Sequence, residues 1–299
     1  MTTFGNILCP VDHYLNLTTD EALRYALAFV RAYEAKLFVF YCVDVIDPSK
    51  APSLQATTGH LKEIVDRAIE LYVPEIERPA LIVECGIVPG DDVGEAITRE
   101  ARDRDIDLIV MGSRRRPLRA ALLGSTAETV CRTAPCPVLV THRQERGWVG
   151  MSTGEVNLER LLVAYDFSEG SALALTHGLS LAQTYQSELH LLHVLPKLDE
   201  TELEITWDEA AAEGAYHKAA RRLQKSVPPE VHLWCKKVVN IVRWGKPYNE
   251  ILEYAKENRI DQICMGAHGA GFRDSALFGS NTDRVLRQSP CPVLVARRP

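Results

Sequence analysis

The feature that most limits how this chain can fold is an internal repeat with a period of about 154 residues. Three segments recur in the same order, two at an offset of 154 and one at 155: Ile7–Asp12 with Leu161–Asp166, Asp107–Gly112 with Asp261–Gly266, and Pro135–Val140 with Pro290–Val295. This period is far longer than that of a solenoid repeat, so it indicates duplication of a whole domain. A length of 299 residues also favours two domains.

Each half alternates apolar strand-like runs with segments of helical periodicity. In the second half, strands are expected at 161–165, 189–195, within 231–242, 262–265 and 293–296, and helices after Ser168 and at 208–225, 247–258 and 280–288. Continuous apolar strands alternating with helices predict a parallel sheet covered on both faces. We therefore expect an α/β fold of two tandem, open, five-stranded parallel sheets, with domains at 1–142 and 158–299 and a polar linker at 143–157.

Composition and charge exclude several classes of function. The formal net charge is −6, and neither half has an excess of Lys and Arg, so a nucleic-acid partner is not expected. No apolar run approaches the roughly 18 residues of a membrane helix, and residues 1–6 show no secretion signal. The eight cysteines form no CxxC pair, which favours reduced thiols. We expect a cytoplasmic protein without a membrane partner.

The most informative motif follows the expected strand 262–265. Glycines at 266, 269, 271 and 279 precede the helix that begins near Ser280. Glycine lets backbone amides approach an anion closely, and a helix N-terminus favours a phosphate group. An ordinary tight turn with a serine cap is the simpler alternative. Neither GxxxxGK[ST] nor GxGxxG is present, so the motif is not a P-loop or a dinucleotide fingerprint.

The spacing Gly266-x2-Gly269-x9-Gly279-Ser280 resembles the nucleotide-binding signature of ATP-binding universal stress proteins. Asp166 and the Pro-Cys-Pro-Val-Leu-Val ending resemble the same family, over nearly the whole chain, as two tandem domains. The resemblance implies a Rossmann-like fold that binds ATP or a similar adenine nucleotide, with or without Mg²⁺, as a regulatory ligand in a stress response.

The resemblance also implies a set of contacts in the second half. Asp166 would lie near the adenine or ribose, and the backbone of Val194 would meet the adenine. Gly266, His268 and Gly269 would surround the ribose and phosphates. The complete expected set in this half is Ala164, Tyr165, Asp166, Val194, Met265, Gly266, His268, Gly269, Gly279, Ser280, Asn281 and Thr282.

The first half departs from this pattern. Arg115 replaces the second glycine, and 11 residues rather than 12 separate Gly112 from Gly124. A non-glycine residue at positive φ costs about 1 kcal/mol or more, which predicts a weak or lost site, whereas added arginine charge could favour phosphate. The weaker set expected here is Pro10, Asp12, Gly112, Arg114, Gly124, Ser125 and Thr126.

Two other functions stay open at this stage. One is a slow adenine-nucleotide hydrolase or transferase that uses the same pocket. No GxSxG motif is present, and the expected place of Asp166 beside adenine is far from a γ-phosphate, so any ATPase activity should be weak. The other is a scaffold that binds a different small ligand without nucleotide. A metal site is not expected, because His190 and His193 would point to opposite faces of a strand.

The last strand of each half is apolar and would be an aggregation hazard if it lay unpaired at a sheet edge. Members of the resembled family often dimerise through this strand. In a tandem chain, residues 138–140 and 293–295 can pair with each other and form an intramolecular pseudo-dimer, and a homodimer of the whole chain is a further possible assembly.

Overall fold

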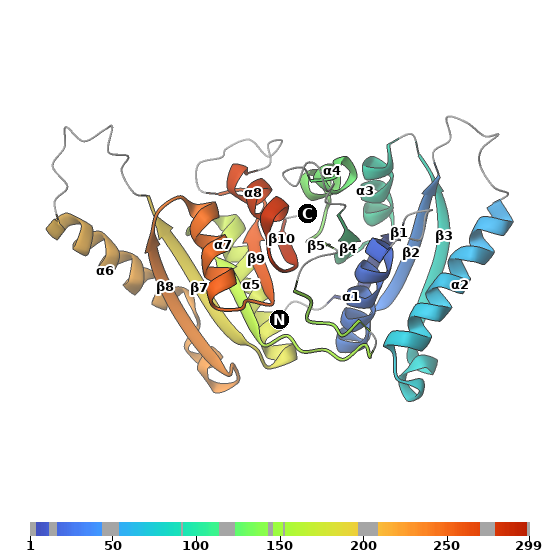
Figure 1. Cartoon of the computed structure of the whole chain (residues 1–299), viewed down its shortest axis with the longest axis horizontal. Coiled ribbons are helices and arrows are strands. Elements are labelled where there is room, and N and C mark those ends of the chain that lie inside the picture. Colours follow the sequence, from blue (N-terminus) through green and yellow to red (C-terminus); the bar gives the residue numbers. More distant parts are fainter. Residues whose placement is uncertain are drawn as a thin grey trace.

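The computed structural model describes residues 4–11, 17–43, 54–90, 92–113, 123–142, 146–151, 153–196, 209–269 and 279–297. Each half alternates strands with helices, as the sequence predicts (Figure 1). The first half comprises β1 (Asn6–Val11), α1 (Leu17–Tyr33), β2 (Lys36–Val43), α2 (Leu54–Tyr72), the 3-10 turn η1 (Glu75–Ala80), β3 (Ile82–Pro89), α3 (Val93–Asp103), β4 (Leu108–Gly112), α4 (Ser125–Thr133) and β5 (Val138–Thr141).

The second half repeats this order. Its elements are β6 (Arg160–Ala164), α5 (Glu169–Tyr185), β7 (Glu188–Leu195), α6 (Glu209–Ser226), the 3-10 turn η3 (Pro229–Leu233), β8 (Lys237–Trp244), α7 (Pro247–Glu257), β9 (Gln262–Gly266), α8 (Ser280–Gln288) and β10 (Val293–Ala296).

The ten strands form one sheet in the order β3-β2-β1-β4-β5-β10-β9-β6-β7-β8. Within each half every pairing is parallel, so the expected α/β fold with parallel five-stranded sheets is confirmed. The two five-stranded parts join where β10 pairs antiparallel with β5, with Leu294 opposite Leu139. In Figure 1 these two strands lie between the halves.

Alternate strand residues face opposite sides of the sheet, and each side has its own apolar core. In β1, Ile7 and Cys9 belong to one core and Leu8 to the other. The first core is covered by α1, α2, α5 and α6, which contribute Phe29, Leu61, Leu181 and Leu223 among others. The second core is covered by α3, α4, α7 and α8. Both cores run through the two halves without interruption.

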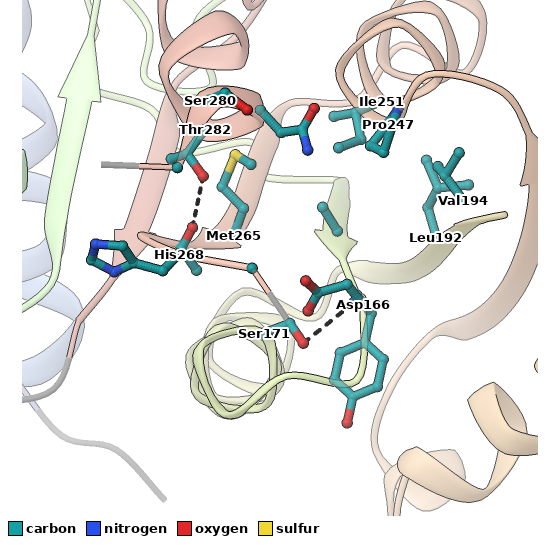
Figure 2. Close-up of a pocket in the computed structure, with 16 residues that line it drawn as sticks. Asp166, Ser171, Leu192, Val194, Pro247, Ile251, Met265, His268, Ser280 and Thr282 are labelled. Atoms are coloured by element: carbon teal, nitrogen blue, oxygen red, sulfur yellow. Dashed lines mark hydrogen bonds between the residues drawn. The ribbon is translucent and has the colours of Figure 1, made fainter. Parts of the chain in front are cut away.

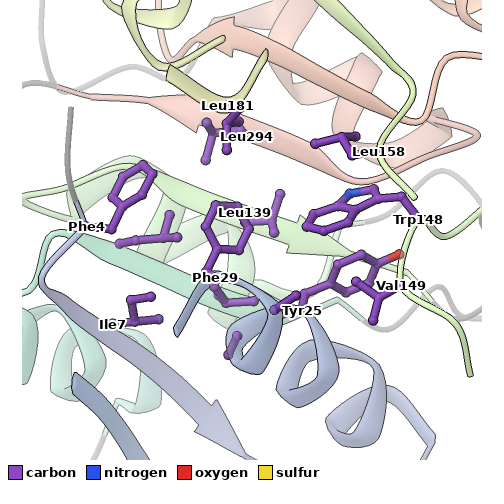
Figure 3. Packing of buried hydrophobic residues seen from close by; sticks show 14 of the residues in the cluster. Phe4, Ile7, Tyr25, Phe29, Leu139, Trp148, Val149, Leu158, Leu181 and Leu294 are labelled. Carbon is purple, nitrogen blue, oxygen red and sulfur yellow. The ribbon is translucent and has the colours of Figure 1, made fainter. Parts of the chain in front are cut away.

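The segment expected as a polar linker contributes to the first core. Trp148 is 2% exposed, and its ring centroid lies 4.9 Å from that of Tyr25 in α1 and 5.4 Å from that of Tyr185 in α5. Its indole N–H donates to the side chain of Gln262 at 3.1 Å. Figure 3 shows Trp148 and Val149 beside Tyr25 and Phe29. The connection between the halves therefore packs against both of them.

Local sequence signals account for several element boundaries. Ser168 caps α5 by accepting from the amide of Ser171 at 3.1 Å, and Pro247 occupies the first turn of α7. The strand expected within 231–242 is β8, which begins at Lys237 after η3 and ends at Trp244, two residues beyond the expected range. All eight cysteines are free thiols, six of them buried. Among the described residues, no helix is long and apolar enough to cross a membrane.

The buried His177 makes the fold sensitive to acid. It is 4% exposed in α5, its ring stacks on Phe4 at 5.8 Å, and burial lowers its pKa to about 4. A histidine in an unfolded chain titrates near 6.5, so the unfolded state binds the proton more readily between these values. We expect the free energy of unfolding to be independent of His177 protonation above pH 6.5. It should fall by up to about 3 kcal/mol as the pH approaches 4.

Urea unfolding at pH 7.5 and pH 4.5 measures this dependence. His177→Leu should reduce the loss of unfolding free energy at pH 4.5, since leucine is apolar, of similar size and has no titrating group. His217→Gln is the matched control, because His217 is exposed on α6. An unchanged loss in His177→Leu would contradict the assignment.

Candidate functional site

A cavity of about 310 Å³ opens in the second half at the carboxyl ends of β6, β7 and β9. The N-terminal turns of α7 and α8 and the start of α5 complete its walls (Figure 2). Open parallel sheets bind ligands at this end of their strands. Its lining residues are Ala164, Tyr165, Asp166, Ser171, Leu192, Val194, Pro247, Ile251, Met265, Gly266, His268, Gly269, Gly279, Ser280, Asn281 and Thr282.

The cavity has an apolar wall and a polar wall. Leu192 and Val194 of β7 lie with Pro247 and Ile251 of α7 on one side in Figure 2, and Met265 of β9 contributes to the floor. Asp166, the glycine backbone and the start of α8 form the polar remainder. Such a pocket fits a ligand with a flat apolar part and an anionic or hydroxylated part.

Glycines in the loop after β9 allow close backbone packing. A Cβ on Gly266 would lie 2.7 Å from the carbonyl carbon of Gly170 in α5, and one on Gly279 would lie 3.0 Å from the oxygen of Ala267. The amide of Gly279 donates to that same oxygen at 3.0 Å. Glycine is therefore required where β9 meets α5, and it relieves a tight contact where the loop returns to α8.

The N-terminus of α8 offers free donors to the cavity. The first intrahelical bond runs from the Asp283 amide to Gly279 oxygen at 2.9 Å, so the preceding amides of Ser280, Asn281 and Thr282 have no partner within the helix. Within the described part of the chain, no side chain caps the helix at Gly279. The Thr282 hydroxyl donates instead to the Gly266 oxygen at 2.9 Å. Three amides at a positive helix end favour an anion.

Asp166 is fixed by its own turn at the other end of the polar wall. Its Oδ1 accepts from the amide of Ser168 at 3.0 Å and from the Ser168 hydroxyl at 2.5 Å. Its amide donates to Ser171 Oγ at 3.3 Å. A Cβ on Gly269 would come within 2.7 Å of Asp166 Oδ2, so glycine at 269 leaves room for this carboxylate.

Side chains from β7 and α6 hold the turn that carries Asp166. Phe167 has a φ of 65°, a left-handed conformation that a side chain rarely adopts. Its ring lies 4.6 Å from that of His193 and 3.9 Å below the guanidinium of Arg222. The Nδ1 of His193 lies 2.7 Å from the Tyr165 oxygen. These contacts offset the backbone strain and fix the position of Asp166.

The structure brings together all twelve residues expected in the second half. Figure 2 shows one difference in detail, because the ring of His268 points away from the cavity and only its backbone lies at the wall. Sequence reasoning missed Ser171, Leu192, Pro247 and Ile251 as lining residues. The alternation of β7 could have identified Leu192, which lies two residues before Val194 and on the same face.

The expected first-half positions are described only in part. Pro10 lies in β1, Gly112 ends β4, Gly124 precedes α4, and Ser125 and Thr126 open that helix. Asp12, Arg114 and Arg115 lie outside the described residues, as does the loop 270–278 of the second half. The Gly124 amide lies 3.5 Å from Ser113 Oγ, and among the described residues a Cβ on Gly124 would meet only that oxygen, at 3.9 Å. Within this part of the chain, the backbone approach is looser than at Gly279.

The histidines of β7 lie on opposite faces of the strand. His190 points into the second core beside the Tyr254 hydroxyl, 2.7 Å from its Nδ1, and burial lowers the His190 pKa. His193 contacts Tyr165 on the other face. In the described part of the chain, no group of three or more His, Cys, Asp or Glu side chains could hold a metal ion.

Comparison with known proteins identifies one family. The model of the universal stress protein family matches residues 3–142 and again 157–297. A universal stress protein of Mycolicibacterium smegmatis is 26% identical over 309 residues, spanning 99% of this chain and 98% of the relative.

A solved structure of nearly the same length has the same fold. A universal stress protein from Archaeoglobus fulgidus has a TM-score of 0.67 and 24% identity, with 98% of both chains covered. Another universal stress protein, solved in complex with cAMP, covers 48% of this chain and 99% of its own, with 22% identity and a TM-score of 0.36.

The packing of Gly266 on Gly170 gives a direct test of the site's geometry. Gly266→Ala should lower the free energy of unfolding by about 1–3 kcal/mol, because its Cβ meets backbone that cannot rotate away. Gly59→Ala is the control: none of the described residues lies within 4 Å of its Cβ in α2, so it should be neutral or stabilising by up to about 1 kcal/mol. Equal effects of the two substitutions in urea unfolding would contradict the close approach.

Proposed function

The chain belongs to the universal stress protein family as a tandem of two family domains, and on that basis we propose that its second half binds ATP or a similar adenine nucleotide as a regulatory ligand. The observation that carries the proposal is the cavity at the ends of β6, β7 and β9, which combines an apolar slot with the free amides of α8. The protein would act in a stress response, in the cytoplasm, through adenine-nucleotide occupancy.

The two ends of a nucleotide match the two walls of the cavity. The base would lie between β7 and α7, against Leu192, Val194 and Ile251, where apolar surface is removed from water. The phosphates would lie at the amides of Ser280, Asn281 and Thr282. Asp166, between these ends, offers a carboxylate oxygen that can accept from ribose hydroxyls.

Binding rather than turnover fits the chemistry of the lining. Asp166 is the one carboxylate among the described lining residues, and the His268 ring points away. General-base catalysis needs a basic group within reach of the attacking water, and Asp166 already accepts two bonds from Ser168. A Mg²⁺ ion that accompanies ATP would take its ligands mainly from the phosphates, since one carboxylate does not build a protein site.

The second half is proposed as the main site because its glycine spacing is intact and its loop packs closely on α5. We also propose that the two family domains, 1–142 and 158–299, work as an intramolecular pseudo-dimer whose connecting segment is 143–157. The antiparallel pairing of β5 with β10 supports this arrangement. The acidic balance of the chain supports a small-molecule ligand over nucleic acid.

ATP titration tests the proposal. Isothermal titration calorimetry should show one ATP site per chain, and Gly269→Val should weaken binding by about tenfold or more, which corresponds to about 1.4 kcal/mol, because the new side chain meets Asp166 Oδ2. Gly214→Ala in α6 is the control and should bind as the wild type does, since no atom of the described part of the chain lies within 4 Å of its Cβ.

Absence of ATP binding, or occupancy confined to the first half in an ATP-soaked crystal, would overturn the proposal. Mass spectrometry of small molecules released when the purified protein is unfolded provides an independent readout. A co-purified adenine nucleotide is the expected result. A different released ligand would instead favour a nucleotide-free scaffold.

A phosphate-release assay separates binding from hydrolysis. At saturating ATP and Mg²⁺ we expect no multiple turnovers, because Asp166 is the one carboxylate among the described lining residues and already accepts two bonds from Ser168. Steady-state phosphate release that Gly269→Val abolishes would show instead that the pocket is an active site.

A further inference from the structure

The two halves are joined by a second type of contact beside the β5–β10 pairing. His142 directly follows β5, and Arg297 directly follows β10. The two residues occupy equivalent positions of the repeat, at its offset of 155. Each side chain crosses to the last turn of a helix in the other half.

His142 contacts the helix that opens onto the cavity. Its Nε2 lies 2.7 Å from the Leu286 oxygen, in the last turn of α8, and its Nδ1 lies 3.2 Å from the Ser113 oxygen, in the glycine loop of the first half. The side chain is almost fully buried, at 1% exposure. The carbonyls of a last helical turn have no intrahelical partner, so the ring supplies a bond that α8 itself cannot make.

Arg297 makes the reciprocal contact. Its Nη1 donates to the Cys131 oxygen at 2.8 Å and to the Arg132 oxygen, both in the last turn of α4. The helices α4 and α8, which follow Gly124 and Gly279, are therefore each held at their C-terminal end by the opposite half.

Backbone bonds connect these contacts to the two glycine loops. The Ser113 amide donates to the Thr141 oxygen at 2.8 Å, and the Ala267 amide donates to the Ala296 oxygen at 3.1 Å. Thr141 and Ala296 directly precede His142 and Arg297. In each half, hydrogen bonds thus connect the glycine loop to the end of the last strand. The next residue then connects that strand end to a helix of the other half, across the β5–β10 pairing.

We propose that His142 is a positioning residue for the nucleotide site of the other half, an inference that rests on the proposed function. It fixes the far end of α8, and with it the direction in which the amides of Ser280, Asn281 and Thr282 face the phosphates. The helix has only nine residues, so it moves as a rigid body. If the contact at Leu286 is lost, the helix can tilt, and the amides at its N-terminus are displaced. The first half thereby contributes to ligand affinity without touching the ligand.

The test compares ATP dissociation constants for three variants. His142→Ala should weaken ATP binding about three- to tenfold. His142→Gln should restore most of the affinity, because its amide nitrogen can take the place of Nε2. Thr141→Val is the matched control: it changes the neighbouring buried side chain and leaves the backbone bond to Ser113, so its affinity should equal that of the wild type. Equal affinities in all four proteins would overturn the inference.

Amide hydrogen exchange separates positioning from a general loss of stability. In the ligand-free protein, His142→Ala should speed exchange of the amides of 283–286 about tenfold, with a much smaller change in α7. In the wild type, ATP should slow exchange of the Ser113 amide in the first half, because coupling between two sites is reciprocal. Unchanged exchange at 283–286 in His142→Ala, or at Ser113 on ATP addition, would contradict the inference.

These measurements can refute the positioning role of His142 and the proposed nucleotide binding independently of each other. A wild type that binds no ATP refutes the nucleotide proposal, while ligand-free exchange at 283–286 still decides whether His142 holds α8. A wild type that binds ATP with an affinity that His142→Ala leaves unchanged refutes the positioning role alone. If His142→Ala does not fold, two other measurements test the inference: the ATP affinity of His142→Gln, and the effect of ATP on exchange of the Ser113 amide in the wild type.

Discussion

The antiparallel pairing of β5 with β10 is the contact on which the rest of the structure depends. Val138–Thr141 and Val293–Ala296 are wholly buried apolar strands, and each would leave an open edge if its half stood alone. Their pairing converts two five-stranded sheets into one and merges the cores on both faces. It also sets α4 and α8 on the same face, where each half reaches the other's helix.

The proposed ligand site is built chiefly from backbone rather than from reactive side chains. Close approach at Gly266 and Gly279 brings β9, α5 and α8 together, and the exposed amides of α8 provide the polar surface. A site made in this way holds an anion by geometry and helix charge. Asp166 is the one carboxylate in the described lining, and this supports the proposal of a regulatory ligand rather than a substrate.

Much of this could be predicted from the sequence, because the signals are local. The repeat, the buried strands and the glycine spacing each depend on neighbouring residues, and the resemblance to universal stress proteins is confirmed by the family match. What was missed depends on packing between distant segments. Trp148 lies in a polar stretch yet fills a gap between α1 and α5, and the direction of the His268 ring is set by tertiary surroundings. Ile251 lines the cavity only because α7 packs beside β7 in the folded chain.

Fusion of the halves removes a constraint that symmetry imposes on two separate chains. In a homodimer, any substitution appears on both sides of the axis at once. Here His142 occupies the repeat position of Arg297, and the buried His177 occupies that of Tyr25. Under the proposed function, the second half can therefore keep the nucleotide-binding loop while the first half evolves side chains that position it. Two identical subunits cannot differ in this way.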